Sequence, residues 1–179
     1  KMRNLLIGLV VCVVGLPLVQ AGERLTPERL WDLARVGSAC VHPDGTSVAY
    51  AVRRYNLPEN QGTSEIHVVD LATQQDRLLV GNLKMADSLA LATTPHGVRL
   101  FFVGVPRGDQ YKDAKPQAWS TDLTGAEPVQ VTAAAAGIAH LKVSPTGTHI
   151  AFTCDVKLDA TVVEQYPDLK STAAFRDLM

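Results

Sequence analysis

The sequence predicts an all-β fold: a partial β-propeller with about two complete four-stranded blades and the start of a third, preceded by a short helix and a signal peptide. Three observations predict it. One turn motif occurs three times, a second motif repeats at the same offset, and each complete unit holds four short apolar runs. Four strands in a unit of about 40–50 residues are typical of a propeller blade.

The turn motif reads HPDGTSVAY, then TPHGVRLFF, then SPTGTHIAF. Pro95 follows Pro43 by 52 residues, and Pro145 follows Pro95 by 50. A glycine stands two positions after each proline, at Gly45, Gly97 and Gly147. Proline presets φ at the second position of a β-turn and glycine relieves the exit of the turn. Each copy is therefore expected to form a tight structural turn.

The residues that follow the turn also repeat. Five positions after the proline the residue is aliphatic, at Val48, Leu100 and Ile150. Seven positions after it the residue is aromatic, at Tyr50, Phe102 and Phe152. Side chains two apart lie on the same face of a strand, so each pair is expected to share one face of the outgoing strand.

The second half of the unit repeats as well, since Asp70-Leu71 is matched by Asp122-Leu123, again 52 residues later. We expect polar loops at 54–64 and 106–116. The expected strands cover 39–43, 47–53, 65–71 and 77–81, then 87–93, 98–104, 117–123 and 128–132. The blades would span about 38–82, 86–133 and 138–179. A β-sandwich with chance turns is the alternative, and agreement in both halves of the unit argues against it.

Residues 1–21 are interpreted as a signal peptide. A short positive region precedes the apolar run LLIGLVVCVVGLPL, and small residues predict cleavage between Ala21 and Gly22. The run is shorter than the roughly 18–20 apolar residues that span a bilayer. An uncleaved anchor and lipidation at Cys12 remain as alternatives. The protein is therefore expected to be secreted or periplasmic, with no stable membrane span after cleavage.

The charge balance excludes some partners. The formal net charge is −1, and removal of the leader, which holds two cations and no acid, leaves −3. There is no Lys/Arg run, so a nucleic-acid partner is not expected. The sequence leaves the oligomeric state open.

A short helix is expected in the lead segment 22–37. Thr26 can cap the helix, Pro27 suits its first position, and Gly37 is expected to close it. Trp31 is interpreted as a packing residue rather than a platform for a ligand.

After loss of the leader two cysteines remain, Cys40 and Cys154. A disulfide between them is a minor alternative, because they fall in the first and third units; Cys154 is expected to be buried. No cofactor and no metal are expected. His42, Asp44 and His67 are not expected to form a metal site, because two of them are in turn or strand-face positions that any solvated residue can occupy.

Two stretches resemble one family. LTPERLWDLARVGSACVHPDGTSVAYAVRRYN and FTCDVKLDATVVEQYPDLKSTAAFRDLM are similar to the start of the propeller, and to the insertion after the third turn, in serine peptidases of the prolyl oligopeptidase family. The branch is that of bacterial dipeptidyl-peptidase-V-like and acylaminoacyl-peptidase-like enzymes. The resemblance covers about Leu25 to Met179. The lead into the first turn, Ala39 to His42, and the second turn, TPHG, depart from the family pattern.

The resemblance implies that this chain is the N-terminal propeller portion of an exported peptidase that releases dipeptides or acyl-amino acids from oligopeptides. The propeller would restrict access to a C-terminal α/β-hydrolase domain with a Ser-Asp-His triad. No catalytic residue is expected here, because G-x-S-x-G is absent from the sequence. Ser144, His149 and Asp155 are not expected to form a triad, since His149 and Asp155 are expected to lie about 20 Å apart along one strand.

The third copy does not yield its expected third and fourth strands, so the chain is interpreted as part of a longer protein. Two other functions remain open. One is a non-enzymatic, TolB-like periplasmic propeller that binds protein partners. The other is a truncated product without activity of its own.

Overall fold

The computed structural model describes residues 24–156 and Glu164. The described part is all-β apart from one helix, α1 (Pro27–Asp32), and a 3-10 turn at Asp109–Tyr111, which confirms the predicted fold class. The strands are β1 (Arg35–Val41), β2 (Ser47–Asn56), β3 (Gln61–Asp70), β4 (Asp76–Thr94), β5 (Gly97–Pro106), β6 (Gln117–Asp122), β7 (Val129–Gln130), β8 (Ala139–Val143) and β9 (Ile150–Thr153).

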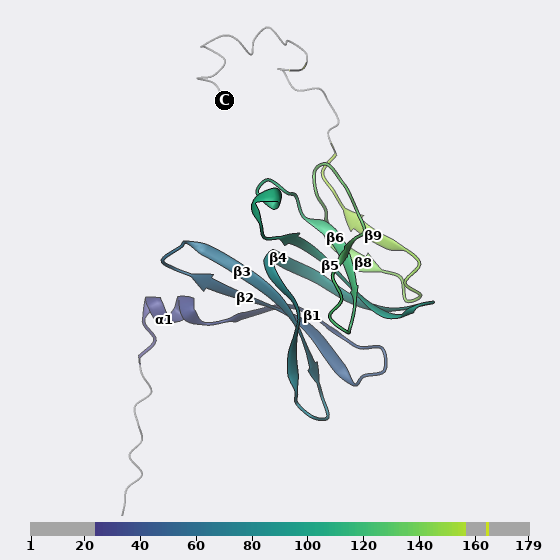
Figure 1. Ribbon diagram of the computed structural model, residues 1–179, viewed down its shortest axis with the longest axis horizontal. Helices are drawn as coiled ribbons and strands as arrows, with labels where there is room; N and C mark the ends of the chain where they lie inside the picture. Colours follow the sequence, from purple (N-terminus) through teal and green to yellow (C-terminus); the bar gives the residue numbers. More distant parts are fainter. Residues whose placement is uncertain (1–23, 157–163, 165–179) are drawn as a thin grey trace, which may run out of the picture.

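The strands follow one another in antiparallel order, β1 to β7 in one sheet and β8–β9 in a second (Figure 1). The strand β4 belongs to two units. Its first part pairs with β3 and its second part with β5, and the register shifts between Leu83 and Met85 and between Asp87 and Ala90. The predicted strands 77–81 and 87–93 are therefore the two halves of one 19-residue strand. Blade 1 is β1–β2–β3 with the first half of β4, and blade 2 is the second half with β5–β6–β7.

The helix begins as predicted and ends earlier than predicted. Thr26 accepts a hydrogen bond from the Arg29 backbone N–H at 3.3 Å, and Pro27 is the first helical residue. The helix ends at Asp32, however, and Gly37 lies inside β1, so the expected stop at Gly37 is wrong. The helix cannot extend to Gly37 because β1 already pairs with β2 from Arg35 onward, and this pairing uses the backbone in an extended conformation.

The predicted loop at 54–64 is also wrong in most of its length. The strands β2 and β3 pair without interruption to Asn56 and Gln61, which leaves a four-residue tip. The polar residues of this stretch occupy a two-stranded extension beyond the rest of the blade, where side chains can face water without disrupting the ladder. The segment 106–116, by contrast, lies outside the strands except at its first residue, as predicted, and carries the 3-10 turn.

The three repeat glycines share one backbone conformation. Gly45, Gly97 and Gly147 have φ of +76°, +100° and +65°, a region that favours glycine. The backbone N–H of Gly45 donates to His42, and that of Gly147 donates to Ser144, both at 2.8 Å.

Three aspartates stabilise turns by accepting hydrogen bonds from the chain just after them. Asp44 accepts from Thr46, Asp122 from Thr124, and Asp70 from Ala72 and Thr73. The Thr46 hydroxyl and backbone N–H lower the pKa of Asp44 to about 2, with His42 adding to the effect. A lowered carboxyl pKa stabilises the folded state above the ordinary pKa of about 4, and this contribution is lost as the pH falls toward 2.

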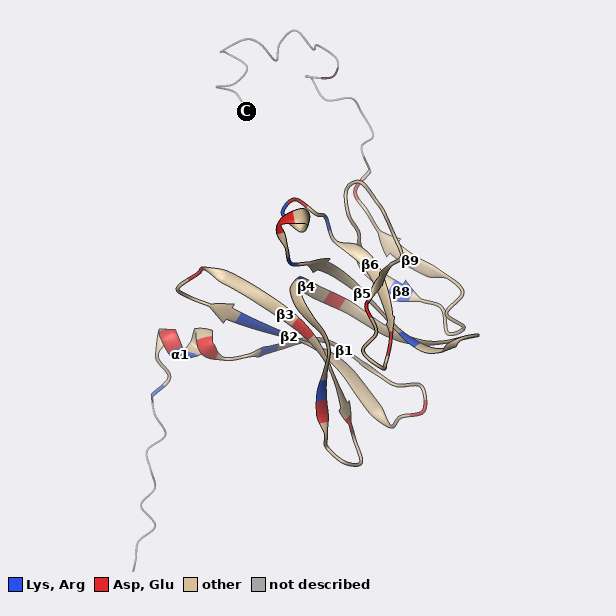
Figure 2. Ribbon diagram, in the orientation of Figure 1, with Lys and Arg blue, Asp and Glu red and all other residues tan. Residues whose placement is uncertain are grey.

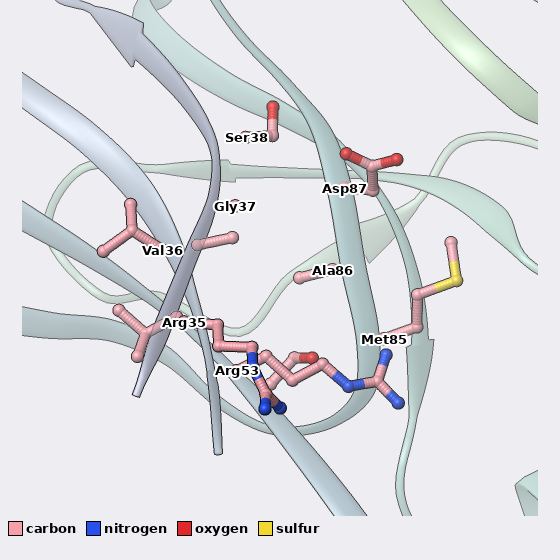
Figure 3. Close-up of a pocket in the computed structure, with 11 residues that line it drawn as sticks. Arg35, Val36, Gly37, Ser38, Arg53, Met85, Ala86 and Asp87 are labelled. Carbon is pink, nitrogen blue, oxygen red and sulfur yellow. The ribbon is translucent and has the colours of Figure 1, made fainter. Parts of the chain in front are cut away.

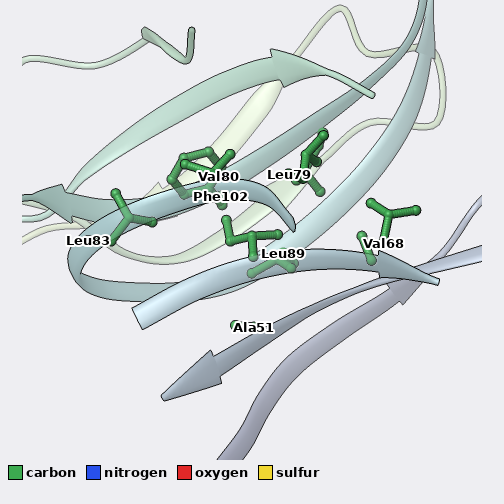
Figure 4. Close-up of a cluster of buried hydrophobic side chains, with 10 residues drawn as sticks. Ala51, Val68, Leu79, Val80, Leu83, Leu89 and Phe102 are labelled. Carbon is green, nitrogen blue, oxygen red and sulfur yellow. The ribbon is translucent and has the colours of Figure 1, made fainter. Parts of the chain in front are cut away.

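Two hydrophobic clusters lie between neighbouring units. The first fills the space between blades 1 and 2, with Ile66, Leu100 and Phe102 fully buried (Figure 4). The second joins blade 2 to the β8–β9 unit through Phe101, Val103, Ile138 and Leu141, which are also buried. Each unit is therefore stabilised mainly by its neighbours, as expected of stacked blades.

The aliphatic and aromatic positions that follow the turn differ in burial between blades 1 and 2. Leu100 and Phe102 share a buried face, as predicted, and pack toward blade 1. In blade 1, however, Ala49 and Ala51 form the core, while Val48 and Tyr50 are only partly buried. Val48 and Tyr50 lie on the face of β2 opposite to Ala49 and Ala51, which pack in the cluster between blades 1 and 2.

Several predictions fall outside the described residues. They are the signal peptide, its cleavage site at Ala21 and Gly22, the alternative of lipidation at Cys12, and most of the insertion after the third turn. Within residues 24–156 no helix has the length and hydropathy needed to cross a membrane.

Candidate functional site: the wall formed by the first strands

The first strands of the three units lie next to one another and form one wall. They are β1, the second half of β4, and β8. Each has a register shift at an equivalent place: between Val36 and Ala39, between Asp87 and Ala90, and between Ala139 and Lys142. First strands line the central channel of a propeller, so this wall is the candidate site.

The bulges put strained residues on the wall. Ser88 and His140, 52 residues apart, have φ of +52° and +53°, a region that non-glycine residues rarely adopt. Strained backbone of this kind is concentrated at functional sites. The hydroxyl of Ser38 in β1 accepts the backbone N–H of Leu89 at 2.9 Å, which joins the two neighbouring bulges.

A cavity of about 240 Å³ opens on this wall. Its lining residues come from all three first strands: Ser38, Ala39, Ser88, Leu89, Ala90, His140, Leu141 and Lys142. The polar side chains of this lining, two serines, a histidine and a lysine, offer hydrogen-bond partners to a bound group. Sequence reasoning missed these residues, although the 52-residue offset between Ser88 and His140 was a signal that could have found them.

Ser144, His149 and Asp155 do not form a triad, and the first two close a turn. The Ser144 hydroxyl accepts the backbone N–H of His149 at 3.1 Å, and the Ser144 N–H donates to the His149 carbonyl at 2.9 Å, so the pair closes a turn. The imidazole of His149 contacts Thr148 at 2.9 Å instead. Asp155 is exposed and lies after the end of β9.

His42, Asp44 and His67 are divided between two places. His42 contacts Asp44 at 2.5 Å within the first turn, whereas His67 lies on β3. Among the described residues no group of three His, Cys, Asp or Glu side chains is arranged to hold a metal ion.

His67 belongs to a polar cluster with Tyr50 and Asp76, on the face of blade 1 that carries Tyr50. Its ring stacks on Tyr50 with 5.6 Å between centroids, and Nδ1 lies 2.9 Å from Asp76. The Tyr50 hydroxyl also donates to Asp76 at 2.9 Å. Desolvation and the nearby Asp76 carboxylate raise the pKa of Tyr50. The cluster replaces the apolar packing that the repeat has at the same place in blade 2.

The two described cysteines are free thiols in different environments. Cys40 packs against the first hydrophobic cluster, and burial raises its pKa to about 11. Cys154 is exposed beyond β9, so its predicted burial is wrong: no described strand covers that position.

This contrast predicts unequal reactivity. At pH 8 iodoacetamide is expected to modify Cys154 at least ten times faster than Cys40, because the thiolate reacts and Cys40 holds its proton. Peptide mapping by mass spectrometry over a time course measures both rates. Equal rates, or a peptide that joins the two cysteines, would contradict the assigned environments.

The stacked four-stranded units, with bulged first strands along one wall, define the described part as a portion of a β-propeller. A solved structure supports the fold: a variant of the AtxE2 isopeptidase with Astexin3-dC4 bound matches with a TM-score of 0.54 and 18% identity, over 72% of this chain and 23% of that chain.

The chain is similar to dipeptidyl-peptidase 5 of Porphyromonas endodontalis, with 27% identity over 173 residues, 92% of this chain and 23% of the relative. It is also similar to dipeptidyl-peptidase 5 of Porphyromonas gingivalis, with 29% identity over 148 residues, 83% of this chain and 20% of the relative. The predicted resemblance to this group of peptidases is confirmed. The chain spans less than a quarter of the length of these relatives, and no family model matches it.

Proposed function

We propose that this chain is the propeller portion of an exported serine peptidase that releases dipeptides or acyl-amino acids from the N-termini of oligopeptides. The supporting observation is the similarity to dipeptidyl-peptidase 5 along 92% of the chain, combined with a propeller wall that carries no triad among its described residues. Residues 1–21 direct export, and the mature protein acts in the periplasm or outside the cell.

In this proposal the propeller and the chemistry belong to different parts of the protein. An α/β-hydrolase domain supplies a serine nucleophile, a histidine base and an oxyanion hole of backbone N–H groups. The propeller limits entry to short, flexible peptides, since a folded substrate does not fit a channel lined by first strands. The access function needs a rigid wall, which the paired bulges and the two inter-blade clusters provide.

The test is labelling of the full-length protein by a fluorophosphonate probe, followed by hydrolysis assays. One covalently labelled serine outside residues 24–156 is expected, together with release of dipeptides or acyl-amino acids from peptides. Dipeptidyl and N-acetyl-amino-acid chromogenic substrates distinguish the two specificities. Absence of labelling, together with stable binding of a protein partner, would favour the TolB-like binding function instead.

A further inference from the structure

Basic side chains gather in the space between blades 1 and 2, at the end where the β2–β3 hairpin projects. Figure 2 shows basic residues on β2 and in the loop that carries the 3-10 turn. The space is a cleft of about 710 Å³, and its cationic lining residues are Arg53, Lys84, Arg107 and Lys112, with Asp109 as the acid. A second cavity adjoins this space and is described next, and we call the two together the basic cleft.

The adjoining cavity has a volume of about 360 Å³ and shares Arg53 with the first. Figure 3 shows Arg35 and Arg53 at one end of this cavity and Ser38 and Asp87 at the other. The basic cleft therefore has five cationic side chains and two acidic ones, in a chain whose formal net charge is −1.

The two arginines are not neutralised by the described part of the chain. Arg35 and Arg53 are directly opposite each other in the β1–β2 register, and like charges in that position are destabilising. Nε of Arg53 is buried and has no hydrogen-bond partner. Arg54, His42 and His67 form ion pairs within 4.0 Å, whereas none of the five cations of the cleft does so among the described residues.

The same cations are nevertheless held in fixed positions. The guanidinium groups of Arg35 and Arg53 lie 4.8 and 5.0 Å from the ring centroid of Tyr55. A Cβ at Gly62 would lie 2.9 Å from Nη2 of Arg53, so the glycine leaves the room that this side chain occupies. Charged groups that are ordered in advance lose little entropy when an anion binds.

The opposite wall of the cleft is equally ordered. Arg107 donates to the Gln61 side chain at 2.5 Å, which ties blade 2 to the hairpin of blade 1. Lys84 donates to the backbone carbonyls of Tyr111 and Lys112 at 2.7 and 3.0 Å, and this fixes the loop that bears Lys112. Neither contact neutralises the charge.

We propose that the basic cleft is a binding site for carboxylate groups of acidic oligopeptides, with Arg53 as the central ligand. The planar fork of an arginine matches the two oxygens of a carboxylate, and the cleft has the volume of a typical ligand site. The choice of a peptide as the source of the carboxylate rests on the proposed peptidase function. The site would favour peptide substrates with Asp or Glu in the part of the peptide that lies against blades 1 and 2.

The test measures peptide binding by the full-length protein after treatment with the fluorophosphonate probe. The ligands are two dye-labelled alanine pentapeptides, amidated at the C-terminus, with a central Asp or a central Asn. Fluorescence anisotropy is expected to show about tenfold tighter binding of the Asp peptide, a typical effect of a charge-assisted hydrogen bond. Arg53→Met is expected to abolish this preference without changing the affinity for the Asn peptide.

Arg54→Met is the matched control. Arg54 is the next residue on the same strand, points to the opposite face and lies 4.0 Å from Glu65, so its loss is expected to leave the preference within twofold. Should Arg53→Met fail to fold, Arg107→Gln on the opposite wall is expected to remove the preference instead.

Equal binding of the two peptides by the protein without a substitution overturns the inference. An equal loss of Asp preference in Arg53→Met and Arg54→Met overturns it as well. If another part of the protein supplies the carboxylate that binds Arg53, the unsubstituted protein will show no preference for the Asp peptide and Arg53→Met will have a lower Tm. This result also overturns the inference. The probe separates the two proposals: labelling without Asp preference leaves the peptidase function standing, and Asp preference without labelling leaves the site standing.

Discussion

Phe102→Ala is expected to destabilise the protein by about 3–5 kcal/mol, the usual range for truncation of a buried phenylalanine. Phe102 is fully buried in the cluster between blades 1 and 2 (Figure 4). Its ring lies over Gly104, where a Cβ would be 2.8 Å from Cε2 of the ring. Alanine would leave a cavity between two units that are held together mainly by this packing. Equilibrium unfolding in guanidinium chloride, monitored by tryptophan fluorescence, measures the loss.

Phe152→Ala is the matched control, because Phe152 occupies the same position of the third repeat and is 39% exposed. Its truncation removes less buried surface and opens no enclosed cavity, so the loss is expected to stay below about 1.5 kcal/mol. If both variants lost equal stability, the packing assigned to the inter-blade cluster would be wrong.

Gln117→Leu is expected to destabilise the protein by about 2–4 kcal/mol. Gln117 is 9% exposed, and its side chain connects β6 to the segment after β7. Its amide N–H donates to the Ala134 carbonyl at 2.7 Å. Its carbonyl accepts from the Thr132 hydroxyl and the Ala134 N–H at 2.8 and 3.0 Å. Leucine keeps the size but removes all three hydrogen bonds. The Ala134 N–H is then unpaired, whereas the Ala134 carbonyl keeps the Gly137 N–H and the Thr132 hydroxyl keeps the Ala118 N–H. An unpaired group costs about 1–3 kcal/mol where it stays buried, and each lost hydrogen bond about 0.5–1.5 kcal/mol.

The control for this variant is Gln130→Leu. Gln130 is exposed, and its amide makes one hydrogen bond to the Thr132 carbonyl, so a change within about 1 kcal/mol is expected. Hydrogen exchange of the Ala134 amide gives a second measurement, because this N–H donates to Gln117: protection should fall in Gln117→Leu and persist in Gln130→Leu. Unchanged protection in Gln117→Leu would show that another contact holds this segment.

The basic cleft and the wall of first strands differ in how far the sequence could predict them. The wall follows from the repeat, because equivalent positions of each unit become neighbours when blades stack. The cleft has no repeated signature: Arg53, Lys84 and Arg107 stand at unrelated places in their units. Their proximity arises from the projecting hairpin and the loop after β5, whose lengths differ from unit to unit.

The helix boundary and the hairpin show where local patterns were insufficient. Gly37 has the residue type of a helix stop, but pairing with β2 ends the helix at Asp32 first. The polar stretch 54–64 reads as a loop, yet a ladder can continue through polar residues when both strands have water on each side. In both cases a partner strand, distant in sequence, decided the local structure.

The sequence by itself determined the class of fold and the repeated turns. Proline, glycine and the alternating apolar residues act within a few positions of one another, so their effect is independent of the rest of the chain. Only the tertiary structure decided which face of each strand is buried. Phe102 is enclosed because blade 1 covers it, whereas Tyr50 at the same repeat position is only partly buried, since it lies on the face of β2 opposite to the cluster between blades 1 and 2. Burial depends on neighbours, and a repeated motif does not specify which neighbour it has.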